Sequence, residues 1–132
     1  PLAEHTQPRL GNHPVFSRSG SLLANKMGEE FTLRYNQRRY LNPQLLAELE
    51  SAGLCVSGYD ESGEQAQAVE LSNHACFIGI QGQPELMSRR ERPHPLLMTF
   101  LQQVRQSNRQ HDVSHDALTK SVRLKQPHLL MG

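Results

Sequence analysis

The chain has 132 residues, of which 36% are hydrophobic and none is Trp, so it can bury only a modest core. Its 14 basic and 13 acidic side chains give a net charge of +1, which offers no general electrostatic reason to bind nucleic acid. Neither an apolar run of roughly 18 residues nor a signal peptide is evident, so we expect a cytoplasmic protein with no membrane partner.

The first third of the chain is predicted to be mostly extended. Residues 1–14 carry three prolines among polar side chains, which predicts an extended lead-in to the fold. Residues 21–23 form a short apolar segment that suits a brief strand or a turn. Residues 30–35 alternate between polar and apolar side chains, so we predict a strand whose aromatic and leucine side chains share one face.

A helix is predicted to follow. Asn42 is a favourable N-cap and Pro43 suits the first helical position, while three leucines give the segment one apolar face. Gly53 predicts the end of this helix, because glycine readily adopts the left-handed conformation of a C-terminal cap.

Three strands and a closing helix are predicted next. Two short apolar segments flank a turn signal at residues 60–63, which predicts an antiparallel hairpin over residues 54–71. Residues 75–81 are apolar on both faces, as expected of a central strand. Pro95 begins a helix whose apolar positions continue at helical spacing to about residue 106.

Residues 107–132 are predicted to form a polar C-terminal tail. His111 and His115 stand four positions apart, a spacing that would let both bind a metal from one helix face. The pattern offers no third ligand, so a polar helical extension is the preferred interpretation, and no cofactor is expected.

The two cysteines lie in apolar surroundings. Cys55 and Cys76 each stand within or just before a predicted strand, where a thiol behaves as a small hydrophobic group rather than as a nucleophile. Their spacing suggests neither a disulfide framework nor a zinc site.

Several sequence blocks occur in the order in which a known family has them. They are residues 9–11, 20–22, 34–43, 49–54, 57–58, 69–70, 78–85 and 88–100. Together they resemble the glutaminase domain of CTP synthase, a class I glutamine amidotransferase. The resemblance implies an α/β fold over residues 15–106: the C-terminal portion of a flavodoxin-like amidotransferase sheet, with an antiparallel hairpin and a closing helix.

The resemblance also bears on catalysis. In this family a Cys nucleophile attacks the amide of glutamine, a His takes the thiol proton, and a Glu two residues later orients the imidazole. The His position holds Gln83 and the Glu position holds Glu85, while the Cys stands in a strand-to-helix elbow N-terminal to every block matched here. A carboxamide does not titrate near pH 7, so Gln83 cannot act as the base.

The family's glutamine-binding Arg corresponds to Arg38, whose guanidinium would suit a substrate carboxylate. Arg39 follows where the family has Tyr, and two His of the same block are replaced by Tyr35 and Gln37. We therefore expect Arg38 and Arg39 to mark the remnant of a glutamine pocket. The alternative is an ion pair between Arg38 and Glu85 that only holds strand ends together.

Three functional hypotheses follow. The favoured one is a non-catalytic relative of the CTP synthase glutaminase domain that acts as a binding or structural module. The second is a glutamine-hydrolysing subunit whose nucleophilic Cys comes from elsewhere, and the third is a fragment of a longer amidotransferase. Because the first strands of the family's sheet are unmatched, we expect a homodimer or another protein chain to cover an exposed sheet edge. A small carboxylate such as glutamine is the expected ligand.

Overall fold

The structure is a computed structural model that describes the backbone of residues 2–124 and the side chains of residues 7–110. The chain divides into two units, Pro1–Phe100 and Leu101–Gly132. The first unit contains the sheet. The described part of the second unit continues a single helix.

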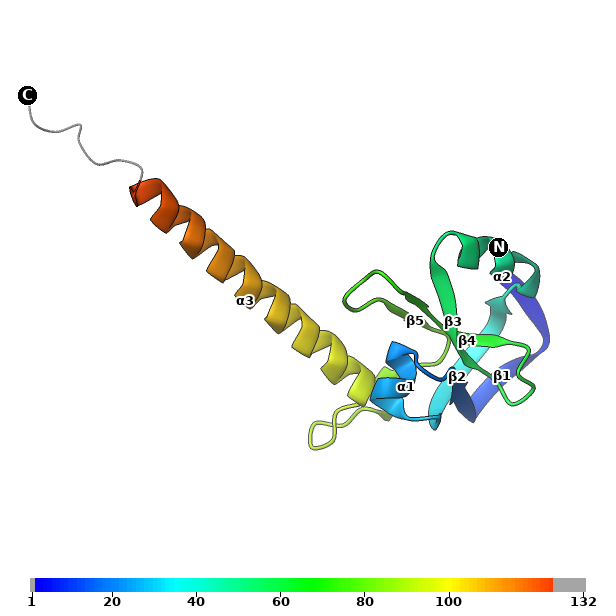
Figure 1. Ribbon diagram of the computed structural model, residues 1–132. Coiled ribbons are helices and arrows are strands. Elements are labelled where there is room, and N and C mark those ends of the chain that lie inside the picture. The colour runs from blue at the N-terminus through cyan, green and yellow to red at the C-terminus, as the bar shows by residue number, and fades with distance from the viewer. Residues whose placement is uncertain (1, 125–132) are drawn as a thin grey trace, which may run out of the picture. The chain divides into compact units, whose positions relative to one another are not determined.

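Five strands form one sheet (Figure 1). They are β1 (Leu2–Ser17), β2 (Glu30–Leu41), β3 (Leu54–Tyr59), β4 (Ala66–Leu71) and β5 (Ile78–Ile80). Their order across the sheet is β2-β1-β3-β4-β5, and each neighbouring pair is antiparallel. The edges of the described sheet are therefore β2 and β5.

Helices connect and close the sheet. They are α1 (Leu22–Met27), η1 (a 3-10 helix, Pro43–Leu45), α2 (Leu46–Ser51), η2 (a 3-10 helix, Pro84–Met87) and α3 (Pro95–Leu124). Within the described residues, no helix combines the length and the apolar character that crossing a membrane requires. The predicted α/β class, with an antiparallel hairpin and a closing helix, is confirmed.

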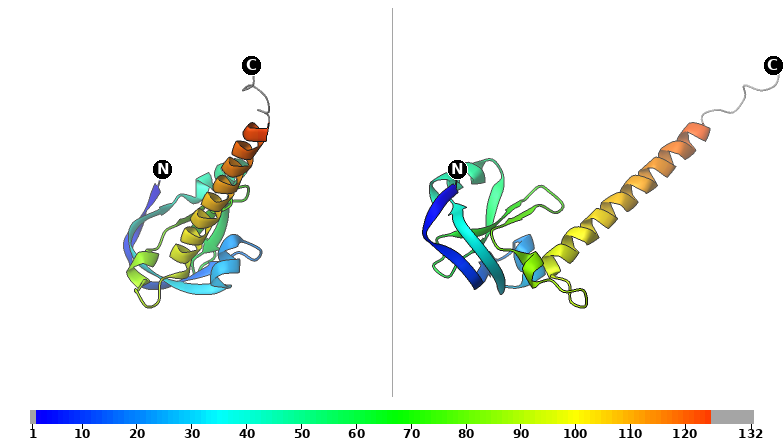
Figure 2. Two further views of the ribbon diagram at one scale, coloured as in Figure 1. Left: turned by 90° about the vertical axis from the view of Figure 1, so that its left-hand side faces the viewer. Right: turned by 180° about the vertical axis from the view of Figure 1, so that it is seen from behind.

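β1 and β2 form a long hairpin whose strands run side by side in the views of Figure 2. The register shifts between Glu4 and Arg9, where β1 carries extra residues. Residues 1–14, predicted to be an extended lead-in, therefore belong mostly to a paired strand. Proline is tolerated in it because Pro14 occupies a position where the ladder does not need its N–H.

Residues 21–23, expected to be a strand or a turn, begin α1 instead. The Ser21 hydroxyl accepts a hydrogen bond from the N–H of Ala24 at 3.0 Å. The carboxylate of Glu70, on β4, accepts the first two N–H groups of α1 at 2.9 and 3.2 Å. One of the two caps thus comes from a distant strand, which no local pattern can reveal.

The core lies on one face of the sheet. Its buried apolar side chains form two clusters, both in contact with Phe31 and Ile80: Val15, Leu33 and Tyr35 in one, and Leu23, Ala68 and Leu96 in the other. The predicted alternation along residues 30–35 is confirmed, since Leu33 and Tyr35 are buried between exposed neighbours.

The local predictions in the middle of the chain are also confirmed. The Asn42 side chain accepts a hydrogen bond from the N–H of Gln44 at 3.0 Å and caps η1, which leads into α2. Gly53 ends the helical segment with a φ of 93°. The hairpin over residues 54–71 turns at Asp60, whose carboxylate accepts the N–H of Gln65 at 3.2 Å.

Two predictions about the second half are wrong. The segment predicted as a central strand over residues 75–81 forms only three residues of strand, and β5 lies at the edge of the described sheet. The closing helix begins at Pro95 as predicted but continues to Leu124 rather than to about residue 106. His111 and His115 belong to this helix, and their side chains lie outside those that the structure describes.

Candidate functional site

The loop that follows β5 is held tightly against β2. The N–H of Gln83 donates a hydrogen bond to the carbonyl of Arg34 at 2.8 Å. A Cβ added at Gly82 would lie 2.8 Å from the Cβ of Leu33 and 3.1 Å from Cζ of Tyr35, so the approach requires glycine. The backbone at the predicted catalytic position is therefore fixed by packing.

The side chain of Gln83 is half-buried on this loop. Its Oε1 is shielded from solvent and accepts no hydrogen bond from the described residues. A buried amide oxygen without a partner costs free energy, because it has lost its hydrogen bonds to water. The loop thus presents an unsatisfied acceptor where the family's relay has a base.

Glu85 is exposed in the first turn of η2. Among the side chains that the structure describes, no ion pair joins Glu85 to Arg38. The structural alternative for Arg38, a pairing with Glu85, is therefore wrong.

Arg38 and Arg39 lie near the end of β2 and are both exposed. Arg38 stands opposite the irregular part of β1, between the pairings of Arg9 and Glu4. Because Gln83 is anchored at Arg34, four residues earlier on β2, strand geometry separates that anchor from Arg38 by about 13 Å. Whether Arg38 and Arg39 bind a ligand stays a prediction.

A polar cluster that the sequence reasoning missed lies beside this loop. The Arg9 guanidinium donates to Glu61 at 3.0 Å and lies 4.8 Å from the centre of the Tyr35 ring. Nδ1 of His13 lies 3.5 Å from the Glu61 carboxylate, and the His13 ring meets the Tyr35 ring edge-on at 5.7 Å. The four side chains tie β1, β2 and the β3–β4 turn together.

The ionisation of this cluster follows from its packing. Burial raises the pKa of Tyr35 to about 12, although the nearby Arg9 charge opposes the shift. Burial also works to raise the pKa of Glu61, but hydrogen bonds from its own backbone N–H and from Arg9 outweigh it and hold that pKa below its usual value. Tyr35 is therefore neutral and Glu61 charged at pH 7. The sequence signals were that Arg9 and Tyr35 belong to matched blocks, and neither His13 nor Glu61 was singled out.

A second set of contacts closes the loop onto α3. The Ser88 hydroxyl accepts the N–H of His94 at 3.1 Å, and Nδ1 of His94 accepts the N–H of Leu96 at 3.3 Å. His94 thus caps the start of α3 while it is 7% exposed, and burial lowers its pKa. These side chains hold the start of α3 in place.

The cysteines lie on separate elements of the first unit. Cys55 is in β3 and Cys76 is two residues before β5, and both are half-buried free thiols. The N–H of Cys76 donates to the ring of His74 at 3.1 Å, which is a backbone contact and not a thiol–imidazole pair. Within the described residues, no group of three potential ligands could hold a metal ion.

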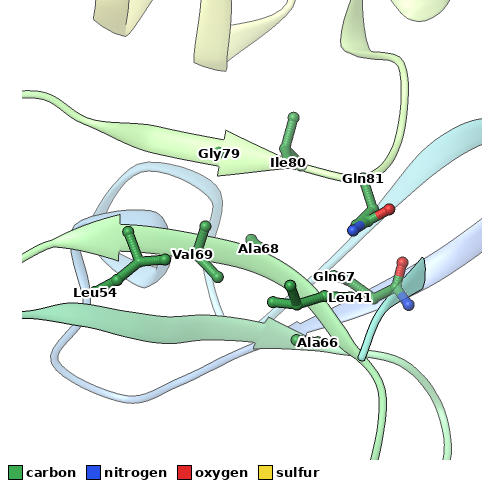
Figure 3. Close-up of a pocket in the computed structure, with 9 residues that line it drawn as sticks. All are labelled: Leu41, Leu54, Ala66, Gln67, Ala68, Val69, Gly79, Ile80 and Gln81. Carbon is green, nitrogen blue, oxygen red and sulfur yellow. The ribbon is translucent and has the colours of Figure 1, made fainter. Parts of the chain in front are cut away.

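A hollow of about 190 Å³, the outer hollow, lies along β4 and β5 (Figure 3). Its wall includes Val69 and Gly79, which pair across β4 and β5, and a Cβ at Gly79 would lie only 2.9 Å from Cγ2 of Val69. The carboxamides of Gln67 and Gln81 lie at the same end of it. Gln67 is 1% exposed, and its Oε1 has no hydrogen-bond partner among the described residues.

Comparison with known proteins shows which proteins this chain resembles. The family model described as Glutamine amidotransferase class-I matches residues 3–103. CTP synthase of Hyphomonas neptunium is 39% identical over 94 residues, which are 70% of this chain and 17% of that protein. CTP synthase of Chloroherpeton thalassium is 32% identical over 108 residues, 81% of this chain and 19% of that protein. The chain thus spans less than a fifth of the length of these relatives.

A solved structure agrees on the fold. The glutaminase domain of Trypanosoma brucei CTPS with bound acivicin superimposes with a TM-score of 0.71 at 23% identity, and the match covers 76% of this chain and 40% of that chain. The family match includes both the anchored loop after β5 and the start of α3. The chain therefore belongs to the class I glutamine amidotransferase family, and the resemblance to the CTP synthase glutaminase domain is confirmed.

Proposed function

We propose that this chain is a non-catalytic glutamine amidotransferase-like module that binds a partner or a small carboxylate and does not release ammonia from glutamine. The observation that carries the proposal is Gln83. Its backbone is anchored as part of a well-packed loop, yet its side chain is a half-buried carboxamide with an unsatisfied oxygen. Such a group cannot take a proton from a thiol.

The surroundings of Gln83 support the same proposal. Glu85 is exposed, and the position two residues before it holds the carboxamide of Gln83 and not an imidazole. His94, the buried imidazole of the following segment, uses Nδ1 to cap α3. We expect such an arrangement, a retained fold without an acid–base group, in a protein that still binds a ligand or partner but no longer hydrolyses glutamine.

The proposal is tested by measuring glutamate release from glutamine with the purified chain and with Gln83→His. Loss of triad members costs on the order of 10⁴-fold or more in rate, so we expect neither protein to exceed the uncatalysed background. Glutamate release by the unmodified chain at the rate of an active glutaminase would overturn the proposal. Gln83→Asn serves as a matched variant that changes the side chain without adding a base.

A second candidate function is a glutamine-hydrolysing assembly in which another polypeptide supplies the elbow Cys. The close packing of the loop after β5 favours this second function. Gly82 lies so near Leu33 that no other residue fits there, and a loop without a role would not need such close packing. This second function would require a base other than Gln83. Glutamine hydrolysis that appears only when this chain meets a Cys-bearing partner would favour this candidate.

The ligand side of the proposal rests on Arg38. Its guanidinium is exposed on β2 and, among the described side chains, takes part in no ion pair, so it is available to a carboxylate. We expect calorimetry with glutamate to give heat at millimolar concentrations for the unmodified chain, and Arg38→Ala to abolish it. Arg34→Ala is the matched control, since Arg34 is exposed on the same face of the same strand. Absence of heat from the unmodified chain would rule out this ligand.

The cytoplasmic location and the homo-oligomeric state expected from the sequence stay predictions. Sedimentation at micromolar concentration measures the second directly. A strictly monomeric species would leave a different protein chain as the expected cover for the sheet edge.

A further inference from the structure

The outer hollow is separate from the residues to which the proposed function is assigned. Neither Arg38 nor Gln83 nor Glu85 contributes to its wall, and its volume is about 190 Å³. An apolar cavity of about 150 Å³ is large enough to hold one benzene molecule. The outer hollow therefore has room for a single ring with one small substituent.

The wall of the outer hollow is largely apolar and carries no charge. Four strands contribute to it, and their apolar side chains include Leu41, Leu54, Val69 and Ile80. None of the lining residues is acidic or basic. A charged ligand would lose its hydration there without gaining a counter-charge, so the wall favours a neutral ligand.

One end of the outer hollow is polar. The carboxamides of Gln67 and Gln81 lie together there (Figure 3). Gln67 is 1% exposed, and its Oε1 receives no hydrogen bond from the described residues, so a buried acceptor is left without a donor. The terminal torsion of a glutamine side chain is soft, and a modest rotation turns this oxygen toward a donor in the hollow.

The walls of the outer hollow are fixed by backbone pairing. The N–H of Gln81 donates to the carbonyl of Gln67 at 2.9 Å, which holds the polar end together. Val69 and Gly79 pair across β4 and β5, and a Cβ at Gly79 would lie only 2.9 Å from Cγ2 of Val69. Glycine at this position therefore leaves space in the wall that any other residue would fill. A site formed in this way needs little rearrangement to accept a ligand.

We propose that the outer hollow binds a small neutral molecule, a single ring that carries one hydroxyl or N–H group. The ring would pack against the apolar side chains of Leu54 and Val69, and the hydroxyl or N–H would donate to Oε1 of Gln67. The proposal goes beyond the proposed function, whose small ligand is a carboxylate at Arg38, because it assigns a second site to a ligand of different charge.

The test is a nuclear magnetic resonance titration of the full, isotope-labelled chain with phenol and with toluene. The two probes have the same number of non-hydrogen atoms, and only phenol has a donor. We expect both to shift the backbone amide signals of Val69, Gly79 and Gln81 in a saturable way at millimolar concentrations, with phenol binding more tightly. An apolar cavity without an acceptor would favour toluene, because phenol gives up the hydration of its hydroxyl. No saturable shift at these amides, or tighter binding of toluene, would overturn the proposal.

The acceptor is located by Gln67→Leu. Leucine is similar in size and removes the unpartnered oxygen, so we expect the variant to fold and its affinity for phenol, relative to toluene, to fall at least tenfold. Gln37→Leu is the matched control, since Oε1 of Gln37 is also buried without a partner among the described residues, whereas Gln37 does not line the outer hollow. The control should change the same ratio by less than about twofold. Equal effects of the two variants would contradict the proposal.

A filling variant covers the case in which Gln67→Leu does not fold. Leu54→Phe enlarges a side chain of the wall, so it should weaken the binding of both probes at least tenfold by occupying the hollow. Leu10→Phe makes the same exchange at a leucine of β1 that is 57% exposed, and it should leave both affinities unchanged. Undiminished binding by a folded Leu54→Phe chain would contradict the proposal. These titrations are independent of glutamate release and of the heat measured with glutamate.

Discussion

In the loop after β5, the backbone is tightly packed, whereas the side chains of Gln83 and Glu85 make few contacts. We call the packed backbone of this loop, with the residues that it contacts, the framework. Gly82 packs against Leu33 with no space for a Cβ, and Gln83 is anchored to β2 through its backbone. By contrast, the Gln83 carboxamide has an unsatisfied oxygen and Glu85 is exposed. The difference teaches that the packing of this loop and the chemistry of its side chains are separable: the backbone is fixed, while the position that aligns with the family's catalytic His holds a carboxamide.

The largest expected effect comes from breaking the framework. Gly82→Val would push branched carbons into Leu33 and Tyr35, so we expect the free energy of unfolding to fall by about 3 kcal/mol. Chemical denaturation monitored by circular dichroism measures the change. A loss below 0.5 kcal/mol would show that the loop is not held as described.

A smaller loss is expected when the cap of α1 is removed. Glu70→Ala leaves two N–H groups at the start of α1 without their acceptor, which should cost about 2 kcal/mol of unfolding free energy. Glu64→Ala is the control, because Glu64 is exposed in the β3–β4 turn and should cost less than about 0.5 kcal/mol. Equal losses for the two variants would contradict the capping role of Glu70.

Because of His94, we expect the free energy of unfolding to depend on pH. Its folded pKa is lowered by burial, so the unfolded chain binds the proton more readily, and stability must fall as the pH drops below the unfolded value of about 6.5. His94→Asn keeps an acceptor for the N–H of Leu96 but does not titrate. Denaturation at pH 7.5 and pH 5.5 should therefore show a smaller acid loss for this variant than for the unmodified chain. An identical loss of stability in the two proteins would show that His94 does not cause the pH dependence.

The smallest effects are expected at the side chains that the loop presents. Gln83→Leu replaces a buried, unpartnered amide with an apolar group of similar size, and Glu85→Ala removes an exposed carboxylate. Each should change the unfolding free energy by less than about 0.5 kcal/mol. If Gln83→Leu lowered the unfolding free energy by more than about 2 kcal/mol, the Gln83 side chain would have a structural partner. The difference between Gln83 and Gly82 would then not hold.

Sequence reasoning succeeded where the signals are local. Asn42, Pro43 and Gly53 marked the boundaries of the helical segment through their own capping chemistry, and the turn at Asp60 fixed the hairpin. It failed for α1, because part of the cap comes from Glu70 on a strand almost fifty residues away.

Two further failures concern long-range context. An apolar run such as residues 75–81 has the same pattern in a central strand and in an edge strand, because periodicity shows only that both faces are apolar. The Arg9–Glu61 pair joins residues that only the fold brings together. The resemblance located Gln83 and Glu85, but it could not show that Glu85 makes no ion pair with Arg38.

The central proposal is that Gln83 leaves the module without a base, and glutamate release measured after co-expression of this chain with the Cys-bearing N-terminal part of a relative's glutaminase domain tests it most directly. Glutamate release should be at background with the unmodified chain and should rise by orders of magnitude with Gln83→His, because only the second combination contains both nucleophile and base. Rapid glutamate release with the unmodified chain would contradict the account.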